Sequence, residues 1–180
     1  MNSPSLPRLS WALGLALLLS SCALNHKNSH LPALIVERLS WMDDVAEAKR
    51  AKGLPIYDPV REAELLRTMT QRGVAAGLKE ENVRRFFTGQ MQAAKVVQEE
   101  WLQQHPQGVI SNEKVPDLKQ TVRPALDAIG QKMITSLATQ RSPAESAAAL
   151  VEACERLARA GYSKAASQRA LKGLEAGLAP

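Results

Sequence analysis

The sequence predicts an all-α protein, with a single helical domain of about six helices and a long central helix. Two observations support this prediction. Ala, Leu, Gln, Glu, Lys and Arg, which have high helix propensity, are abundant, whereas aromatic residues make up only 4% of the 180 residues. Apolar residues also recur at i, i+3 and i+4 along most of the chain. A chain of this length can bury one substantial core.

Residues 1–22 have the order of a secretory signal peptide. Arg8 precedes an apolar run over residues 11–19, which is too short to span a bilayer stably. The run Leu19-Ser20-Ser21-Cys22 resembles a bacterial lipobox and predicts lipid attachment to the membrane at Cys22, with soluble release after Ala23 as the alternative. We therefore expect an exported, periplasmic protein that is either anchored as a lipoprotein or released.

Residues 23–31 are expected to form a flexible leader, and the helical domain covers residues 32–180. The first three predicted helices lie at the start of this domain. The apolar spacing predicts one helix over residues 32–51, and Gly53 and Pro55 end it. Asp58 and Pro59 are typical of a helix start, as N-cap and first helical residue, and this second helix runs to about residue 77. The third helix begins at Glu80 and ends before Pro106. Its roughly 25 residues span about 38 Å.

Three further helices complete the domain after a linker at residues 107–117. The fourth covers residues 118–137, and Pro124 within it marks either a kink or a late start. The fifth runs to residue 159 from a capping box, Ser142-Pro143-Ala144-Glu145. The sixth ends near residue 174. Cys154 lies in the fifth helix at helical spacing from apolar neighbours, and we expect it to be a small core residue rather than a nucleophile.

The charge pattern and the missing motifs exclude several functional classes. A formal net charge of +5 is modest, and the basic residues alternate with acidic ones instead of forming a stripe with aromatics, so no nucleic-acid partner is expected. His26, His30 and His105 lack the spacing of metal ligands. Nucleophile elbows, P-loops and dinucleotide-binding motifs do not occur. An enzyme with this sequence would therefore use no metal or cofactor.

Arg38 and Lys49 are the most informative pair of residues. They are eleven residues apart, so on a helix they point within roughly 20° of each other. The same face carries Leu34, Val45 and Ala46, and a cationic pair in such an apolar stripe needs an anion to offset its desolvation. The stripe offers too few carboxylates, which makes a bound anion the simplest candidate.

Further polar residues on the predicted helix faces extend this cationic site. Lys95 and Gln98 are three residues apart and therefore neighbours on the third helix. Two arginines and a lysine suit a small dicarboxylate, and a carboxamide can hydrogen-bond an ether or carbonyl oxygen. The candidate set is Arg38, Lys49, Asp58, Arg61, Glu62, Lys95, Gln98 and Arg123.

These residues, with their spacings, resemble the all-helical chorismate mutases. The pattern is Arg38-x10-Lys49, then Leu54-Pro55-Ile56-x-Asp58-x2-Arg61-Glu62, with Phe86-x3-Gln90 and Lys95-x2-Gln98 downstream. The resemblance covers about residues 31–137 and is strongest from Arg38 to Glu62. The signal peptide and the extra C-terminal helices are similar to the secreted, monofunctional subclass, in which one chain builds the whole active site.

The resemblance implies an isomerase that converts chorismate to prephenate, in aromatic amino acid biosynthesis. Lys49 and Gln98 would be catalytic and contact the ether oxygen of the substrate. The substrate-binding residues would be Arg38, Arg61 and Arg123 for the carboxylates, Glu62 for the hydroxyl group, Asp58 to orient it, and Lys95. Ala94 departs from the family, which often has a hydroxyl residue there, and the disulfide cysteines of some secreted members are absent.

Two other functions share this inventory of residues. An isochorismate pyruvate-lyase of related fold would use a similar cationic pocket, and a noncatalytic envelope protein could bind a small anion or a partner with the same helices. The resemblance also implies a homodimer.

Overall fold

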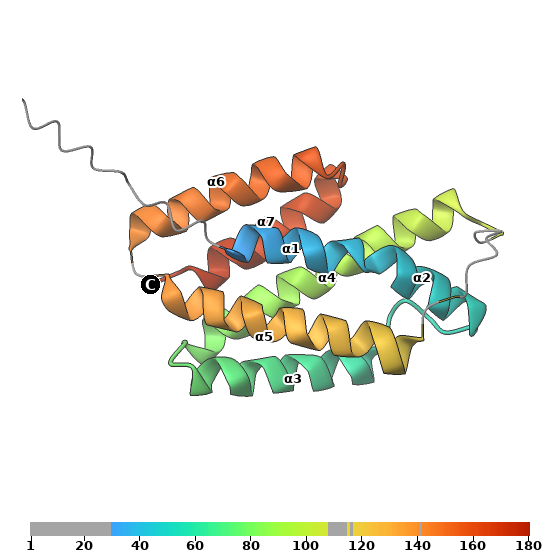
Figure 1. The fold of residues 1–180 in the computed structure, drawn as a ribbon, viewed down its shortest axis with the longest axis horizontal. Helices are drawn as coiled ribbons and strands as arrows, with labels where there is room; N and C mark the ends of the chain where they lie inside the picture. Colours follow the sequence, from blue (N-terminus) through green and yellow to red (C-terminus); the bar gives the residue numbers. More distant parts are fainter. Residues whose placement is uncertain (1–29, 108–114, 116, 141) are drawn as a thin grey trace, which may run out of the picture.

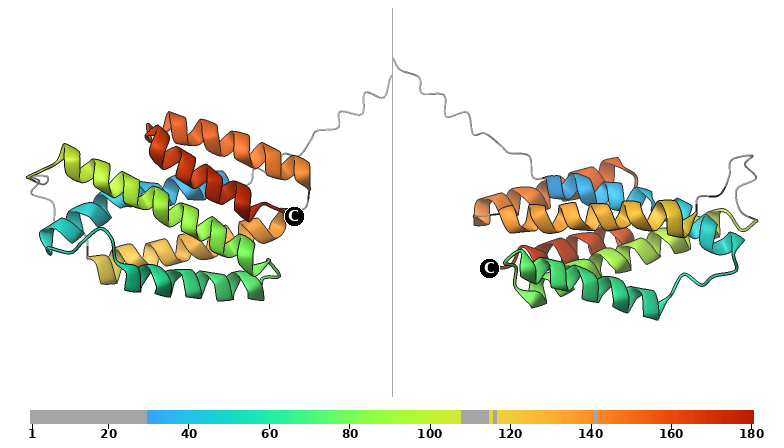
Figure 2. Two further views of the ribbon diagram at one scale, coloured as in Figure 1. Left: turned by 180° about the vertical axis from the view of Figure 1, so that it is seen from behind. Right: turned by 60° about the horizontal axis from the view of Figure 1, so that its bottom comes forward.

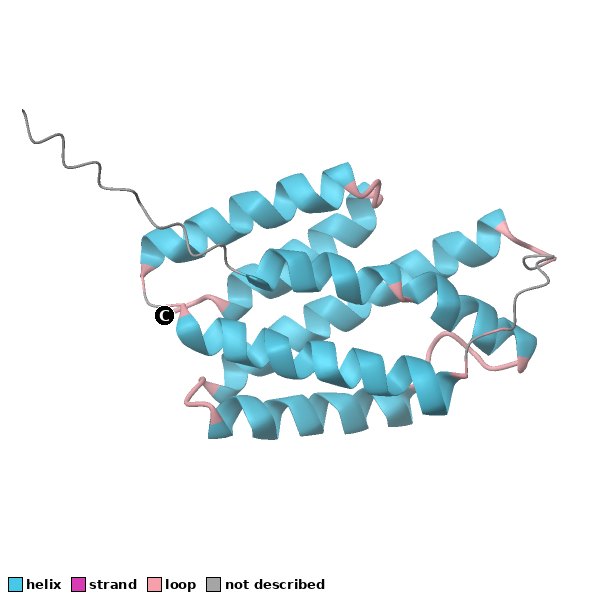
Figure 3. Cartoon of the chain, viewed as in Figure 1, coloured by secondary structure: helices cyan, strands magenta, loops and turns pink. Residues whose placement is uncertain are grey.

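The computed structural model describes residues 30–107, 115, 117–140 and 142–180, and within them the chain forms seven α-helices and one short π-helical turn. Their bounds are α1 (His30–Ser40), α2 (Met42–Ala51), α3 (Pro59–Ala75), α4 (Glu80–Gln104), η1 (Leu118–Val122), α5 (Arg123–Thr139), α6 (Pro143–Arg159) and α7 (Lys164–Gly177). Figure 3 shows that no strand occurs in these ranges. The all-α prediction is confirmed. None of the helices in these ranges is both long enough and apolar enough to cross a bilayer.

Helix α4 is the central element, as its predicted length of roughly 25 residues suggested. It packs against α7 on one side and against α2 and α3 on the other (Figures 1 and 2). Phe86 and Phe87 on α4 are fully buried and contact each other edge to face. Gly89 on α4 lies so close to Gly173 on α7 that a Cβ at residue 89 would come within 2.5 Å of the neighbouring Cα. The two backbones therefore meet directly, which only glycine permits.

The first predicted helix is in fact two helices, separated at Trp41. The hydroxyl of Ser40 donates a 2.8 Å hydrogen bond to the carbonyl of Glu37, which diverts a helix acceptor at this point. Asp43 and Asp44 then lie in the first turn of α2, where negative charge favours a new helix start. Helix α1 also begins at His30, two residues earlier than predicted, because Leu31 is fully buried in the core.

Pro124 marks a late start of its helix, which was one of the two predicted possibilities. Proline at the second position of α5 cannot follow an ordinary α-turn, because its ring would clash with the carbonyl four residues before it. The preceding turn, η1, is wider. The amide of Val122 donates to the carbonyl of Asp117, five residues back, at 3.1 Å.

The predicted helix caps at Asp58 and Ser142 are both present. The Asp58 side chain accepts from the backbone N–H of Arg61 at 3.0 Å, and Pro59 follows it at the first helical position. Ser142 and Glu145 form the reciprocal capping box. These caps set the first turns of α3 and α6, and the first turn of α3 carries Arg61 and Glu62.

The expectation for Cys154 was wrong, since this residue is exposed. The buried residues of α6 are Ala149, Ala153 and Leu157, which repeat every four residues. Cys154 lies one residue, or about 100°, beyond Ala153 and so faces solvent. The predicted signal peptide, the lipobox at Cys22 and most of the leader lie outside the described residues.

Candidate active site

One pocket brings together all eight residues that the sequence singled out. Helices α1 to α5 and the segment between α2 and α3 surround it, and the pocket with the solvent at its mouth encloses about 810 Å³. The predicted residues in its lining are Arg38, Lys49, Asp58, Arg61, Glu62, Lys95, Gln98 and Arg123. The other lining residues are Met42, Val45, Ile56, Leu65, Met91, Ala94, Leu118, Val122, Leu126 and Asp127.

Each polar side chain enters the pocket from a defined place on its helix. Arg38 is in the last turn of α1, and Lys49 is in the last turn of α2. Glu62 is in the first turn of α3, and Gln98 is on the buried face of α4. Arg123 is the first residue of α5. The eleven-residue step from Arg38 to Lys49 thus still leads into one pocket although the helix is interrupted at Trp41.

Arg38 is a buried charge. Its residue is 6% exposed, and its Nη1 has no hydrogen-bond partner. Burial lowers the pKa of Arg38 to about 10, and none of the described carboxylates offsets this effect. The guanidinium remains protonated at neutral pH, so it lies in the pocket as an uncompensated cation. An anionic ligand would supply the missing partner.

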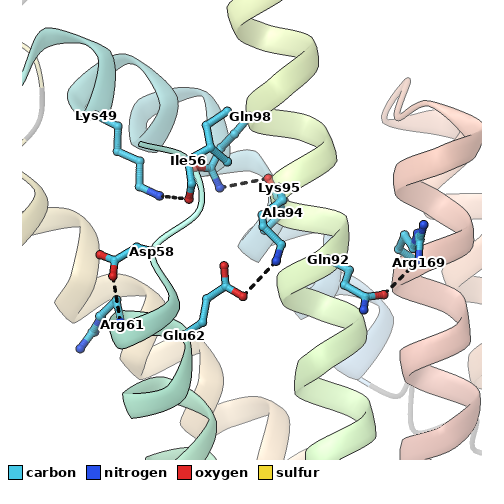
Figure 4. A network of polar contacts seen from close by, with 10 residues as sticks. All are labelled: Lys49, Ile56, Asp58, Arg61, Glu62, Gln92, Ala94, Lys95, Gln98 and Arg169. Atoms are coloured by element: carbon cyan, nitrogen blue, oxygen red, sulfur yellow. Dashed lines mark hydrogen bonds and ion pairs between the residues drawn. The ribbon is translucent and has the colours of Figure 1, made fainter. Parts of the chain in front are cut away.

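Lys49 is tied to the segment that leads into α3. Its Nζ donates a 2.7 Å hydrogen bond to the carbonyl of Ile56, as Figure 4 shows. Desolvation lowers the pKa of Lys49 most, and the positive charges of Arg123 and Lys95 lower it further, while Asp58 and Glu62 act in the opposite direction. These four charges are therefore the electrostatic surroundings of the ammonium group.

Two ion pairs involve the predicted substrate-binding residues. Lys95 on α4 contacts Glu62 on α3 at 2.9 Å, and its Nζ also lies 5.0 Å from the centroid of the Tyr57 ring. Arg61 pairs with Glu64 on its own helix at 2.6 Å. A carboxylate of a ligand could replace Glu64 as the partner of Arg61.

The side-chain amide of Gln98 is buried and only half satisfied. Its Nε2 donates to the carbonyl of Ala94 at 3.0 Å, whereas its Oε1 has no partner (Figure 4). Rotation of the terminal amide about χ3 would exchange the two groups and turn the donor away from Ala94. Gln98 can therefore offer a ligand either an acceptor or, after this rotation, a donor.

No role in the site was predicted for Asp127 or for Ile56, although Ile56 belongs to the sequence pattern. Asp127 lies four residues after Arg123 on α5, a spacing visible in the sequence, but it binds Arg72 on α3, 55 residues away, which no local pattern indicates. Ile56 contributes its main-chain carbonyl, which every residue type has. The apolar periodicity that predicts the fourth helix includes Leu118, Val122 and Leu126, but these residues were not expected to form an apolar wall of the pocket.

The charges of the lining favour an anion with two negative groups. Five cationic side chains face three carboxylates, an excess of two positive charges. The apolar wall beside them suits the carbon skeleton of such a ligand. In the described part of the chain, no group of three His, Cys, Asp or Glu side chains could hold a metal ion.

Comparisons with known proteins agree with this geometry. Residues 24–99 match the family model of chorismate mutase type II. A secreted chorismate mutase of Yersinia pestis is 35% identical over 79 residues, which are 42% of each of the two chains.

Solved structures extend the likeness to nearly the whole fold. A crystal structure of chorismate mutase from Burkholderia thailandensis is similar with a TM-score of 0.68 and 28% identity, and the match covers 81% of this chain and 95% of that one. The secreted chorismate mutase from Yersinia pestis shares the fold, with a TM-score of 0.70 at 22% identity over 81% of this chain and 94% of its own.

Replacing Arg38 by methionine should stabilise the ligand-free protein and remove its affinity for the anion. The substitution keeps most of the buried volume and eliminates a charge whose lowered pKa indicates a desolvation cost at every pH below about 10. We expect a gain of roughly 1 to 3 kcal/mol in the free energy of unfolding, measured with urea at pH 7. Arg67→Met, on the exposed side of α3, is the control and should change little. A less stable Arg38→Met protein would contradict the assignment of Arg38 as an uncompensated charge.

Proposed function

We propose that this chain, which belongs to the type II chorismate mutase family, is an isomerase that converts chorismate to prephenate. One observation carries the proposal. Five cationic side chains from helices α1 to α5 converge on a single pocket, and the Nη1 of Arg38 is buried with no hydrogen-bond partner among the described residues. Chorismate, with two carboxylates, a hydroxyl group and an ether oxygen on a small ring, complements this inventory.

The reaction needs no nucleophile, acid or base from the protein. It breaks one carbon–oxygen bond and forms one carbon–carbon bond within the same molecule, with no transfer of a proton or a group to the enzyme. Catalysis therefore depends on holding the compact conformer and on stabilising charge that develops in the transition state. We assign the first task to Arg38, Arg61 and Arg123, which bind the two carboxylates.

The second task falls to Lys49 and Gln98. As the carbon–oxygen bond breaks, negative charge grows on the ether oxygen, and donors placed there stabilise the transition state more than the ground state. Lys49 would exchange the carbonyl of Ile56 for this oxygen, which keeps the ammonium hydrogen-bonded in both states. Gln98 would turn its amide from Ala94 to donate as well.

Three further residues support the substrate hydroxyl group in this proposal. Glu62 accepts from the hydroxyl, and Lys95 holds the Glu62 carboxylate in place at 2.9 Å. Asp58 acts through the backbone, since it caps α3 at the N–H of Arg61 and so orients the turn that carries both Arg61 and Glu62.

Export to the periplasm and assembly as a homodimer also belong to the proposal. The signal-peptide pattern supports export, and so does the similarity to a secreted chorismate mutase. Lipidation at Cys22 predicts a mature protein that begins with a modified cysteine, whereas soluble release predicts an N-terminus after Ala23. Mass spectrometry of the mature protein separates the two. Recovery of the full chain with residue 1 retained would overturn both.

Replacing Lys49 by alanine should lower kcat by about 100- to 1000-fold, which is typical of the loss of a donor that stabilises transition-state charge. The assay follows the disappearance of chorismate and identifies the product. Thermal unfolding should change little, because within the described part of the chain the side chain makes one hydrogen bond, to the carbonyl of Ile56. Lys52→Ala is the matched control, as this exposed lysine has a 3.9 Å surface contact with Asp117. A fully active, folded Lys49→Ala protein would rule out the assigned role, and release of pyruvate by the wild type would refute the reaction.

The pH profile should be flat between pH 5 and 7 and should fall on the alkaline side. Gln98 needs no protonation to donate, so Gln98→Glu should introduce a new loss of activity with rising pH in this range. Lys49 is charged mainly below its pKa, and this pKa is lowered from the usual value of 10.5. As the pH rises, kcat/KM should therefore already decline before pH 10.5 is reached. A bound dianion raises this pKa again, and kcat should therefore fall at higher pH than kcat/KM. Coincident alkaline limbs, or a steep fall between pH 5 and 7 in the wild type, would contradict these assignments.

A further inference from the structure

Asp127 creates a conflict in the pocket. It lines the same cavity as Arg123 and lies four residues after it on α5, the spacing at which side chains on a helix face each other. A free carboxylate there would repel an anionic substrate. It would also attract the Arg123 guanidinium, which the proposed function assigns to a substrate carboxylate.

The structure resolves this conflict with a residue outside the pocket. Arg72, in the last turn of α3, binds both oxygens of Asp127, with Nη1 3.0 Å from Oδ1 and Nη2 3.2 Å from Oδ2. Helices α3 and α5 lie side by side at this point (Figure 1). Arg72 is eleven residues beyond Arg61, so both point toward the α5 side of α3, yet Arg72 is not part of the pocket lining.

Arg123 remains available as a result. Among the described residues, none forms a hydrogen bond or an ion pair with its side chain, although a carboxylate lies one turn away. Its charge reaches the centre of the site, because it is one of the groups that lower the pKa of Lys49.

We infer that Arg72 is a positioning residue, which occupies both oxygens of Asp127 and thereby keeps Arg123 free to bind a substrate carboxylate. The inference rests on the proposed function and adds a residue to it. A purely structural role for the pair is the competing explanation. The side chains of Arg72 and Asp127 are 35% and 47% exposed, and ion pairs at such positions usually contribute little to stability.

The test compares the two single variants with the double variant. Arg72→Met should raise KM for chorismate by roughly 2- to 10-fold with little change in kcat, because Asp127 is released to pair with Arg123 and to repel the substrate. Asp127→Asn should leave KM at or below the wild-type value, since no carboxylate then competes for Arg123. Adding Asp127→Asn to Arg72→Met should restore KM. Arg67→Met, which removes an exposed arginine from the same helix, controls for net charge.

The outcomes separate the explanations. A structural clamp between α3 and α5 predicts equal damage in the two single variants and no rescue in the double variant, and that pattern would overturn the inference. An unchanged KM in Arg72→Met would overturn it as well. Thermal unfolding of each variant distinguishes loss of affinity from loss of fold. If the wild-type protein fails to convert chorismate, the proposed function fails. Wild-type turnover without the Arg72 effect refutes only the inference.

Discussion

The buried charge of Arg38 is the constraint on which the rest of the site depends. Its guanidinium is buried, one of its nitrogens has no hydrogen-bond partner among the described residues, and burial lowers its pKa, so the fold disfavours the charged form. A folded protein retains such a group only when the surrounding structure outweighs its cost. Here the apolar side chains buried on α1, α4 and α5 provide the stability that offsets the cost of burying this charge. In return, the site holds a cation that needs no reorganisation before an anion arrives.

Three of the other four cations in the pocket have a partner in the ligand-free structure. Lys49 donates to the carbonyl of Ile56, Lys95 pairs with Glu62, and Arg61 pairs with Glu64. These contacts keep the side chains hydrogen-bonded in the empty site. Since a main-chain carbonyl is neutral, Lys49 gives up less than a full ion pair when a charged ligand replaces it. In the proposed complex, Lys49 and Arg61 therefore exchange one contact for another, Lys95 keeps Glu62, and Arg38 and Arg123 gain a partner.

Local chemistry explains why much of this arrangement could be predicted from the sequence. The helix caps at Asp58 and Ser142 act within one turn, and an eleven-residue step keeps two side chains on one side even across a short interruption. Contacts that depend on tertiary packing could not be predicted. The pairing of Arg72 with Asp127 requires α3 and α5 to be adjacent, and the exposure of Cys154 depends on which face of α6 meets α1 and α7. The break at Trp41 was missed because Ser40 and Trp41 carry no strong helix-breaking signal.

Helices α6 and α7 do not contribute residues to the pocket lining, but α7 affects the site through α4. Figure 4 shows that Lys95 on α4 points toward Glu62 on α3, while Gln92 on the same helix points toward Arg169 on α7. Helix α4 thus lies between the pocket and α7. The backbone contact of Gly89 with Gly173 sets the distance between α4 and α7. No disulfide joins the described helices, where Cys154 is the one cysteine, so packing and hydrogen bonds such as that of Arg169 with Gln92 maintain this distance. Because Lys95 and Gln98 lie within three turns of Gly89, a shift of α4 away from α7 would move both side chains relative to Arg38 and Lys49. The glycine contact, remote from the chemistry, therefore helps to define the distances on which the catalytic proposal depends.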